Sequence, residues 1–561
     1  MTKAASPRLG WLDRAARSSR GAWDVLRHRG PGQIQFWFIA LAVGIAAGFA
    51  ALFFRKAINA LQAILYGTND VDHIHSFAAG LPWFWVLAVP IGGGLVVGMI
   101  LHLFTPDGQA RSVAHVIEGS ALYEGQVETK EGMASTAASL VTLAAGGSTG
   151  REGPVVLLAA VICTWVNRMI SADGITAREL LGCAVAAAVS ASFNAPIAGA
   201  LFAMEVVLRH FAVKSFAPIV IASAVGTVIN RVEFGGLTEF RLPTEGAMGF
   251  YGELPAFLLL GLLCGLVAVV FMRAIFWTDD LGTRWQRRLG IPRWLRPAIA
   301  GALLGLIAIW FPHVIGVGYE TTSRALTGQL LWYQAIVFCV VKTAAVAITM
   351  GGRMGGGVFS PSLMVGALTG LAFGAIATGI FPDISGSGTL YALAGMGAVA
   401  GAVLGAPIST TLIVFELTGD WQTGLAVMVA VSMSTALASR LVDRSFFLSQ
   451  LERRKITLSK GPQAYLLSMF RVANVMRTSD HARAAPPDAL WEAIEEGISV
   501  DGNATLATAL PIFDETGRTF IPVVRLGGRG EAPEILGALF HVDALRAYNR
   551  ALAATAAEEH S

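Results

Sequence analysis

The chain has 561 residues, of which 54% are hydrophobic and only 14% are charged, and its mean hydropathy is +0.60. A soluble globular protein carries about 25% charged residues, so the composition excludes that class and indicates a membrane protein that crosses the bilayer several times. The formal net charge of +3 is too small to indicate a nucleic-acid partner. All four cysteines lie in apolar runs, where we expect small core residues rather than a disulfide or metal framework.

The first 32 residues are polar and rich in arginine, and we expect no cleavable signal peptide there. Long apolar runs follow at about 34–66, 82–104, 215–231, 252–276, 295–311 and 331–350. Shorter or glycine-interrupted runs lie at about 131–145, 153–170, 177–191, 196–208, 358–381, 389–404, 408–418 and 422–441. Many of the shorter runs cannot cross an apolar core of about 30 Å, which takes about 20 residues. We therefore predict half-spanning helices that meet inside the protein.

After residue 460 the composition becomes that of a soluble domain. A short helix is predicted at 505–510, strands at 520–524 and 535–540, and a further helix from 542, which together indicate a small α/β module. We thus predict three regions, namely a segment 1–32, a membrane domain 33–460 and a module with its tail at 461–561. Basic residues flank the membrane domain on both sides, so both termini are expected to be cytoplasmic.

Two short patterns occur twice along the chain. Ala195-Pro196-Ile197, Leu201 and Glu205 recur at 406–408, 412 and 416 with an offset of 211, and the glycine and proline of 150–154 recur at 357–361 with an offset of 207. Two nearly equal offsets indicate two homologous halves, at about 34–235 and 250–445. Inverted repeats whose helices are broken at matching positions are typical of transporters, with the site where the repeats meet.

The most informative residue is Glu152, in the glycine-rich turn 146–154 between two apolar runs. A carboxylate at membrane depth costs about 2.5–3.5 kcal/mol, so it is a functional-site hypothesis by default. Pro154 suits the first turn of a helix, whose free N–H groups can bind an anion. We predict that ionised Glu152 occupies the anion site and leaves it when protonated. The alternative is a structural carboxylate that caps the helix or pairs with Arg151.

A second glycine-rich turn precedes Pro361, and the backbone N–H groups of Val358 and Phe359 are expected to face a cavity there. A third candidate is the stretch 108–114, followed by a helix that contains Glu118. Each helix N-terminus carries about half a positive charge. Converging N-termini can therefore bind an anion without a lysine or arginine, which would hold it too tightly for release.

These motifs resemble the CLC family of chloride channels and proton-coupled anion exchangers, over about residues 33–460. The resemblance implies an all-α polytopic membrane protein with an inverted-repeat CLC-type fold and broken helices. It also implies a homodimer in a lipid bilayer, with one pore per subunit for chloride or another small anion, no enzymatic activity and no cofactor or metal. We expect the cell inner membrane as its location. The motif residues that carry the resemblance are Gly150, Arg151, Pro154, Gly357 and Pro361.

The resemblance assigns roles to single residues. It implies that Glu152 is the gating glutamate and that the N–H groups of Gly153, Val358 and Phe359 contact the anion. The soluble module is similar to a CBS domain, with one clear motif near 500–549. Modules of this kind often bind adenine nucleotides, which makes a nucleotide a candidate partner.

The chain departs from the family at both side-chain hydroxyls of the anion site. The serine of the early loop corresponds to Arg111, or to Ser112 if the loop is shifted by one residue. The tyrosine of the last membrane helix corresponds to Phe447, which has no hydroxyl. Arg111 is predicted to bind the anion or to pair with Glu152, and the alternative is that it faces the aqueous mouth. An arginine in the pathway would also favour larger oxyanions.

The internal proton-relay glutamate of the exchangers corresponds to Val206. A passive, channel-like pathway is therefore the leading hypothesis. One alternative is a proton-coupled exchanger that uses another relay, for which His115 and His210 are candidates. Another is a sensor-like member in which Arg111 plugs the pathway and the cytoplasmic module carries the function.

Overall fold

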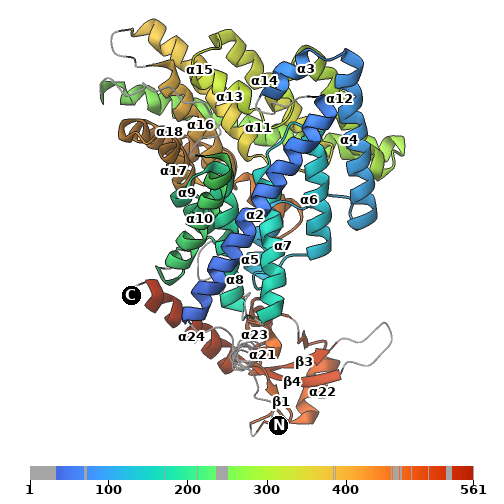
Figure 1. Cartoon of the computed structure of the whole chain (residues 1–561). Coiled ribbons are helices and arrows are strands. Elements are labelled where there is room, and N and C mark those ends of the chain that lie inside the picture. Colours follow the sequence, from blue (N-terminus) through green and yellow to red (C-terminus); the bar gives the residue numbers. More distant parts are fainter. Residues whose placement is uncertain are drawn as a thin grey trace, which may run out of the picture.

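A computed structural model describes residues 33–67, 73–170, 172, 174–211, 213–235, 251–382, 385, 387–456, 458, 467, 470–481, 483–502, 504–525 and 534–559. The predicted N-terminal segment 1–32 lies outside these described residues. Helices dominate the structure, with a small α/β module at one end (Figure 1).

Every apolar run of the sequence forms a helix, and ten helices of the described residues are long and apolar enough to cross a membrane. The first half contains α2 (Gln33–Tyr66), α3 (Ile74–Ala79), α4 (Trp83–Phe104), α5 (Val113–Leu122), α6 (Thr129–Ala144), α7 (Glu152–Ile170), α8 (Gly174–Phe193), α9 (Pro196–Phe202), the π-helix η2 (Ala203–Leu208) and α10 (Val213–Phe234). The second half begins with the 3-10 turn η3 (Tyr251–Glu253). It continues with α11 (Leu254–Leu289), η4 (Arg293–Leu295), α12 (Arg296–Trp310), η5 (Pro312–Val314), α13 (Tyr319–Leu326), α14 (Trp332–Gly351), α15 (Phe359–Ile380), α16 (Gly388–Leu404), α17 (Pro407–Thr418), α18 (Trp421–Leu441) and α19 (Phe446–Arg453).

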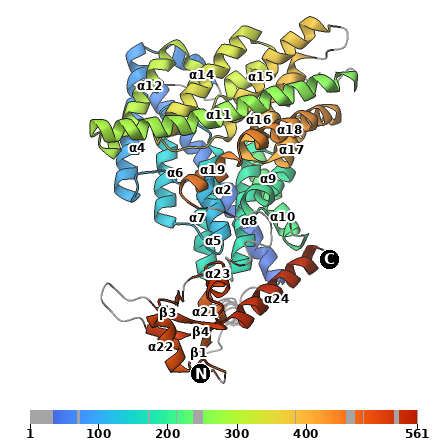
Figure 2. The same cartoon turned by 180° about the vertical axis from the view of Figure 1, so that it is seen from behind.

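The prediction of helices too short to span the bilayer is confirmed. Helices α5, α16 and α17 and the continuous α9–η2 segment have 10–17 residues each. The long helix α11 instead crosses the back of the domain obliquely (Figure 2). It continues beyond its apolar stretch to Leu289, and this polar end was not predicted from hydropathy.

Matched positions of the two halves bind each other. Glu205 accepts hydrogen bonds from the backbone N–H groups of Ile408 (3.0 Å) and Ser409 (2.8 Å) at the start of α17. Glu416 accepts them from Ile197 (2.9 Å) and Ala198 (2.8 Å) at the start of α9. Each glutamate thus caps a helix of the other half, where free N–H groups and the helix dipole favour a negative charge. The two positions that the repeat offset of 211 relates therefore play the same structural part in the two halves.

Replacing either capping glutamate with alanine is expected to destabilise the membrane domain by about 1–2 kcal/mol, because a helix N-terminus loses its acceptor. Glu205→Ala should cost more than Glu416→Ala, since Glu205 also binds the hydroxyl of Ser409. Thermal unfolding in detergent measures both. The control is Glu233→Ala, which removes an exposed ion pair with Lys56 and should change little. Equal stability of all three variants would contradict the capping role.

The soluble module is a four-stranded sheet in the order β1-β4-β3-β2. Its elements are α21 (Val472–Val475), β1 (Arg477–Thr478), α22 (Pro487–Glu495), β2 (Val500–Asp501), α23 (Leu506–Thr516), β3 (Phe520–Arg525), β4 (Glu534–Phe540) and α24 (His541–Glu559). Strand β3 pairs antiparallel with β4 and parallel with β2. The predicted α/β character of the module is confirmed.

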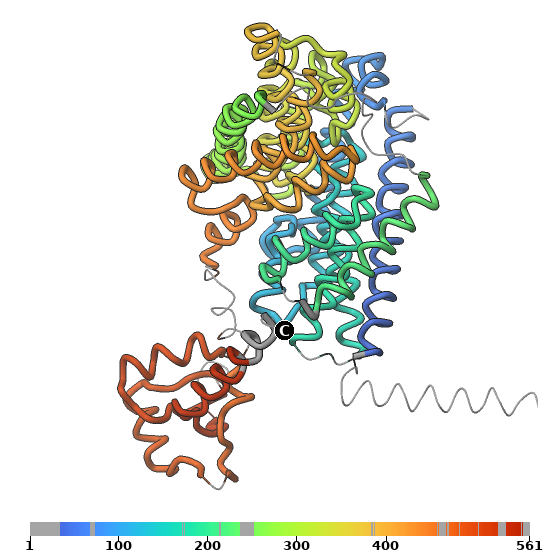
Figure 3. Tube along the Cα trace, turned by 90° about the vertical axis from the view of Figure 1, so that its left-hand side faces the viewer, coloured from blue at the N-terminus to red at the C-terminus, as the bar shows by residue number. Residues whose placement is uncertain are grey.

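The module lies beneath the membrane domain (Figure 3). Arg471, at the start of the module, forms an ion pair at 3.5 Å with Glu124, just after α5. Helix α24 also contacts α10. The module therefore touches the membrane domain directly, next to the helix whose other end carries Ser112.

Candidate functional site

The two glycine-rich turns of the sequence meet in the middle of the membrane domain. The N–H of Gly150 donates to the carbonyl of Gly357 (2.7 Å), and the N–H of Gly357 donates back to Gly150 (2.9 Å). The hydroxyl of Thr149 also donates to the Gly357 carbonyl, at 2.8 Å. These bonds hold the N-termini of α7 and α15 against each other, so the prediction that two broken-helix starts converge is confirmed.

The first turns of these helices carry free donors. Val358 and Phe359 are 1% and 3% exposed, and the Phe359 ring packs against Phe193 and Phe202 with ring centroids 4.6 and 5.6 Å apart. Within the described part of the chain, the backbone N–H groups of Gly153, Val358 and Phe359 have no hydrogen-bond acceptor. Buried N–H groups without a partner are costly, so these three mark the place where an anionic ligand fits.

Glu152 lies at this junction and is only 1% exposed. Its Oε1 accepts a hydrogen bond from the Tyr319 hydroxyl (2.8 Å) and another from the Ser360 hydroxyl, and the two hydroxyl oxygens are 3.2 Å apart. Its Oε2 has no hydrogen-bond partner. A Cβ on Gly150 would stand 2.6 Å from that oxygen, so only glycine leaves room for the carboxylate. Three elements thus hold the side chain, namely α7, α13 and α15.

Tyr319 is the functional residue that sequence reasoning missed. The fully buried Lys342 donates to the carbonyls of Val314 (3.3 Å) and Gly316 (2.9 Å) and so fixes the loop that leads into α13. Glu320, which follows Tyr319 in the chain, pairs with His75 of α3 at 2.9 Å. Arg151 lies over the Tyr319 ring, with Cζ 5.0 Å from the ring centroid. The tyrosine is therefore held on several sides with its hydroxyl at Glu152.

Gly356 is required next to this junction. Its φ is +142°, and a Cβ there would stand 2.0 Å from the hydroxyl oxygen of Thr149. We expect Gly356→Ala to lower the free energy of unfolding by about 2–4 kcal/mol through backbone strain and overpacking. The control is Gly379→Ala near the end of the helix α15 that follows this turn, where a Cβ meets no atom within 4 Å and stability should be kept or rise. Thermal unfolding in detergent compares the two, and equal melting temperatures would contradict the expectation.

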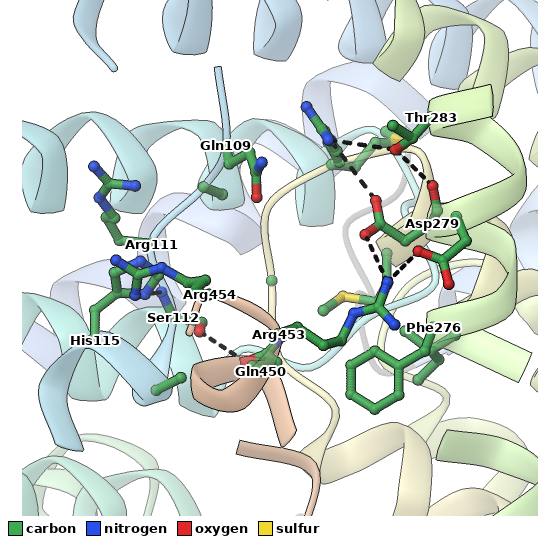
Figure 4. A pocket seen from close by; sticks show the side chains of 18 residues that line it. Gln109, Arg111, Ser112, His115, Phe276, Asp279, Thr283, Gln450, Arg453 and Arg454 are labelled. Atoms are coloured by element: carbon green, nitrogen blue, oxygen red, sulfur yellow. Dashed lines mark hydrogen bonds and ion pairs between the residues drawn. The ribbon is translucent and has the colours of Figure 1, made fainter. Parts of the chain in front are cut away.

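Arg111 does not bind Glu152 in the structure. Its guanidinium pairs with Asp107 (2.8 Å) and with Glu128 (3.1 Å), and Figure 4 shows the side chain directed away from Ser112. Partial burial opposes the charge of Asp107, but the charge and hydrogen bond of Arg111 outweigh it and hold the pKa of Asp107 below its usual value. The predicted ion pair with Glu152 is therefore not formed, because nearer carboxylates take the guanidinium.

Ser112, the residue that the shifted alignment of the early loop offers as the hydroxyl donor, lines a cavity at the start of α5. It precedes the first residue of α5, and its hydroxyl donates to Oε1 of Gln450 on α19 at 3.1 Å. Phe447, one turn earlier on α19, is 4% exposed and packs against Phe446 with ring centroids 5.9 Å apart. The last membrane helix thus presents an amide to the early loop, where the family comparison had led us to expect only the loss of a hydroxyl.

A cavity of about 320 Å³ lies between the start of α5, α11 and α19 and reaches Gly356, beside the start of α15 (Figure 4). Its lining contains four arginines and two aspartates. Asp279 is shared by Arg296 (2.8 Å) and Arg353 (3.7 Å), and Arg453 pairs with Asp280. Each arginine of the lining therefore has a carboxylate partner, and the cavity is polar without a clear excess of positive charge.

Val206 lies in the π-helix η2 and is 5% exposed. A π-helical turn inside a helix often accompanies a functional position, but the only carboxylate of this turn, Glu205, is bound to the start of α17. His115, one of the two candidate relays, accepts a hydrogen bond on Nδ1 from the Ser112 N–H at 3.1 Å.

A family model described as voltage gated chloride channel matches residues 93–439. A ClcB-like protein of Ralstonia nicotianae is 30% identical over 432 residues, which cover 76% of this chain and 99% of that protein. The voltage-gated ClC-type chloride channel ClcB of Escherichia coli is 30% identical over 422 residues, which cover 73% and 97%. Two solved structures share the fold. A slow cyanobacterial Cl⁻/H⁺ antiporter has a TM-score of 0.66 at 20% identity, covering 76% of this chain and 98% of that one. A eukaryotic CLC transporter has a TM-score of 0.63 at 16% identity, covering 91% and 97%.

Proposed function

The chain belongs to the voltage gated chloride channel (CLC) family, and on that premise we propose that it carries chloride or a similar small anion along a pathway gated by Glu152. The observation that carries the gate is the buried carboxylate held by two hydroxyls beside unpartnered helix N–H groups. In this proposal the anion binds the N–H groups of Gly153, Val358 and Phe359. The backbone dipoles attract it without a full cation, so it can leave again.

The gate acts by repulsion between like charges. The carboxylate of Glu152 is bound to the hydroxyls of Tyr319 and Ser360 and to none of the three N–H groups, so it lies beside the proposed anion site rather than in it, as the sequence had led us to expect. Ionised Glu152 repels an anion from the junction and stays bound to Tyr319 and Ser360. A protonated carboxyl no longer repels it and binds the hydroxyls more weakly, because a charge-assisted hydrogen bond is about twice as strong as a neutral one. Protonation therefore opens the pathway, and anion flux rises as the pH falls.

We propose passive, channel-like transport, because the internal relay position is the buried Val206 and the carboxylate of Glu205 is committed to a helix N-terminus. Proton-coupled exchange through another relay is the alternative, and two proteins that share the fold are a Cl⁻/H⁺ antiporter and a CLC-type fluoride/proton antiporter.

The test is the reversal potential of the protein in planar bilayers with a fixed chloride gradient and an imposed proton gradient. Passive transport gives the chloride equilibrium potential at every proton gradient. A reversal potential that moves with the proton gradient would establish coupling and overturn the channel-like proposal. Absence of any anion flux would overturn the transport proposal itself.

We further propose that two copies assemble into a homodimer in the inner membrane with both termini cytoplasmic. The apolar side chains of Ile197 and Ile408, at the starts of α9 and α17, are about half exposed and support a protein contact there. The soluble module is then a cytoplasmic regulatory unit, for which an adenine nucleotide is a candidate ligand. Mass photometry in detergent tests the dimer, and calorimetric titration with ATP tests the ligand.

A further inference from the structure

Gln450 lies beside Ser112 in the proposed anion pathway. It lies on α19 and lines the cavity that runs from Ser112 to Gly356. Figure 4 shows its side chain meeting Ser112 across the cavity, with a dashed hydrogen bond between them. The two residues are in contact although they lie 338 positions apart in the sequence.

The hydrogen bond has a direction that matters. A serine hydroxyl has a single proton, and that of Ser112 is donated to Oε1 of Gln450 at 3.1 Å. While this bond stands, Ser112 has no donor left for an anion. The amide of Gln450 carries two further N–H donors on Nε2, on a residue that lines the cavity.

Cationic side chains lie around this point. Arg353, Arg453 and Arg454 line the same cavity. They pair with Asp279, Asp280 and Glu118, respectively, so their charges are largely neutralised and fixed in place. An amide can bind an anion there and still release it, because the amide itself carries no charge.

We propose that Gln450 is an anion-binding residue of the pathway, whose amide oxygen accepts the hydrogen bond of Ser112 and whose amide N–H groups bind the anion instead. This inference rests on the proposed transport function. Because the Ser112 hydroxyl is bound to Gln450, it contributes to anion binding only when Gln450 is replaced.

A double-mutant cycle tests the proposal, with bromide affinity measured by calorimetry on the full-length protein in detergent. Ser112→Ala alone should change the affinity less than about twofold. In the Gln450→Met background the hydroxyl is free to turn to the anion, so Ser112→Ala should weaken binding about tenfold, as expected for a hydrogen bond to a charged group. An equal effect of Ser112→Ala in both backgrounds would overturn the proposal.

Gln109 provides a matched control, because it lines the same cavity without contacting Ser112. Gln450→Glu places a negative charge at the proposed contact and should weaken bromide binding about tenfold, whereas Gln109→Glu should weaken it about twofold. Similar losses in the two variants would show that only the charge of the cavity matters and would also overturn the proposal.

Flux measurements on the same variants distinguish a failure of the Gln450 proposal from a failure of the proposed transport function. Wild-type protein that moves no anion overturns the transport function, whatever the binding data show. Wild-type protein that moves anions, with no coupling between Ser112 and Gln450 in the cycle, overturns the role of Gln450 alone.

Discussion

Anion flux through the Glu152→Gln variant is expected to lose most of its dependence on pH. Glutamine keeps the size of the side chain and its acceptor for the Tyr319 hydroxyl, but it carries no charge at any pH. It therefore mimics the protonated carboxyl, and the pathway stays open where the wild-type carboxylate closes it. The effect is large because repulsion between two unit charges at ~4 Å amounts to about 4 kcal/mol at an effective dielectric of 20.

Chloride efflux from reconstituted vesicles between pH 4.5 and 7.5, an interval of about three pH units chosen to bracket carboxyl titration, measures this directly. The control is Glu233→Gln, which changes an exposed carboxylate of the membrane domain and should leave the pH profile as in the wild type. A Glu152→Gln variant whose flux still falls with rising pH would contradict the assignment of Glu152 as the gate.

Removing the Tyr319 hydroxyl is expected to loosen the gate. Tyr319→Phe deletes one of the two hydrogen bonds to the ionised carboxylate of Glu152. A hydrogen bond to a charged group contributes about 1.5–3 kcal/mol, which corresponds to a shift of roughly 10- to 150-fold in the balance between closed and open gate. Because the lost bond stabilised the ionised, closed form, half-maximal flux should move to higher pH by roughly one to two units.

Flux against pH in the same vesicles measures the shift. Tyr333→Phe is the matched control, since Tyr333 is half exposed at the start of α14, whereas the buried Glu152 is bound by Tyr319 and Ser360. Ser360→Ala should move the curve in the same direction as Tyr319→Phe, because it removes the other hydroxyl. If neither variant moves the curve, the two hydroxyls do not hold the gate closed.

The gate could be predicted from sequence because its parts are unusual in a membrane. A glutamate and several glycines at a break in apolar runs leave few interpretations, and the repeat pointed to Val358 and Phe359 as their partners. The hydroxyls around Glu152 are harder, because tyrosine and serine are common residues and their directions are not encoded in a pattern. Tyr319 nevertheless follows Ser112 by 207 positions, the offset that relates Gly150 to Gly357. Applying the repeat offset to Ser112 would have found it.

Arg111 shows the opposite case. Its position in the early loop was predicted, but the direction of its side chain depends on Asp107 and Glu128, which lie in neighbouring turns. A one-residue shift of the loop exchanges Arg111 for Ser112 at the cavity, and no single-sequence argument decides between them. Gln450 was missed because the family comparison drew attention to Phe447, one helical turn away.

In the soluble module the strands β3 and β4, the helix α23 before them and the helix α24 after them could be predicted from their apolar and β-branched residues. Strands β1 and β2 have two residues each, which is too short for a periodic pattern, and their pairing with β4 and β3 comes from the fold alone.

The reciprocal caps also order events during synthesis. Glu205 binds a backbone group 203 residues further along the chain, and Glu416 binds one 219 residues back. A ribosome that adds about 5–20 residues per second takes roughly 10–40 s to make the partner of Glu205. Throughout that interval the first half lacks its cap on α9, and until residue 357 is made it also lacks the glycine contact that holds α7. The helix N-termini of the newly made first half therefore lack their acceptors in the membrane, and the pathway forms only after the second half has been synthesised.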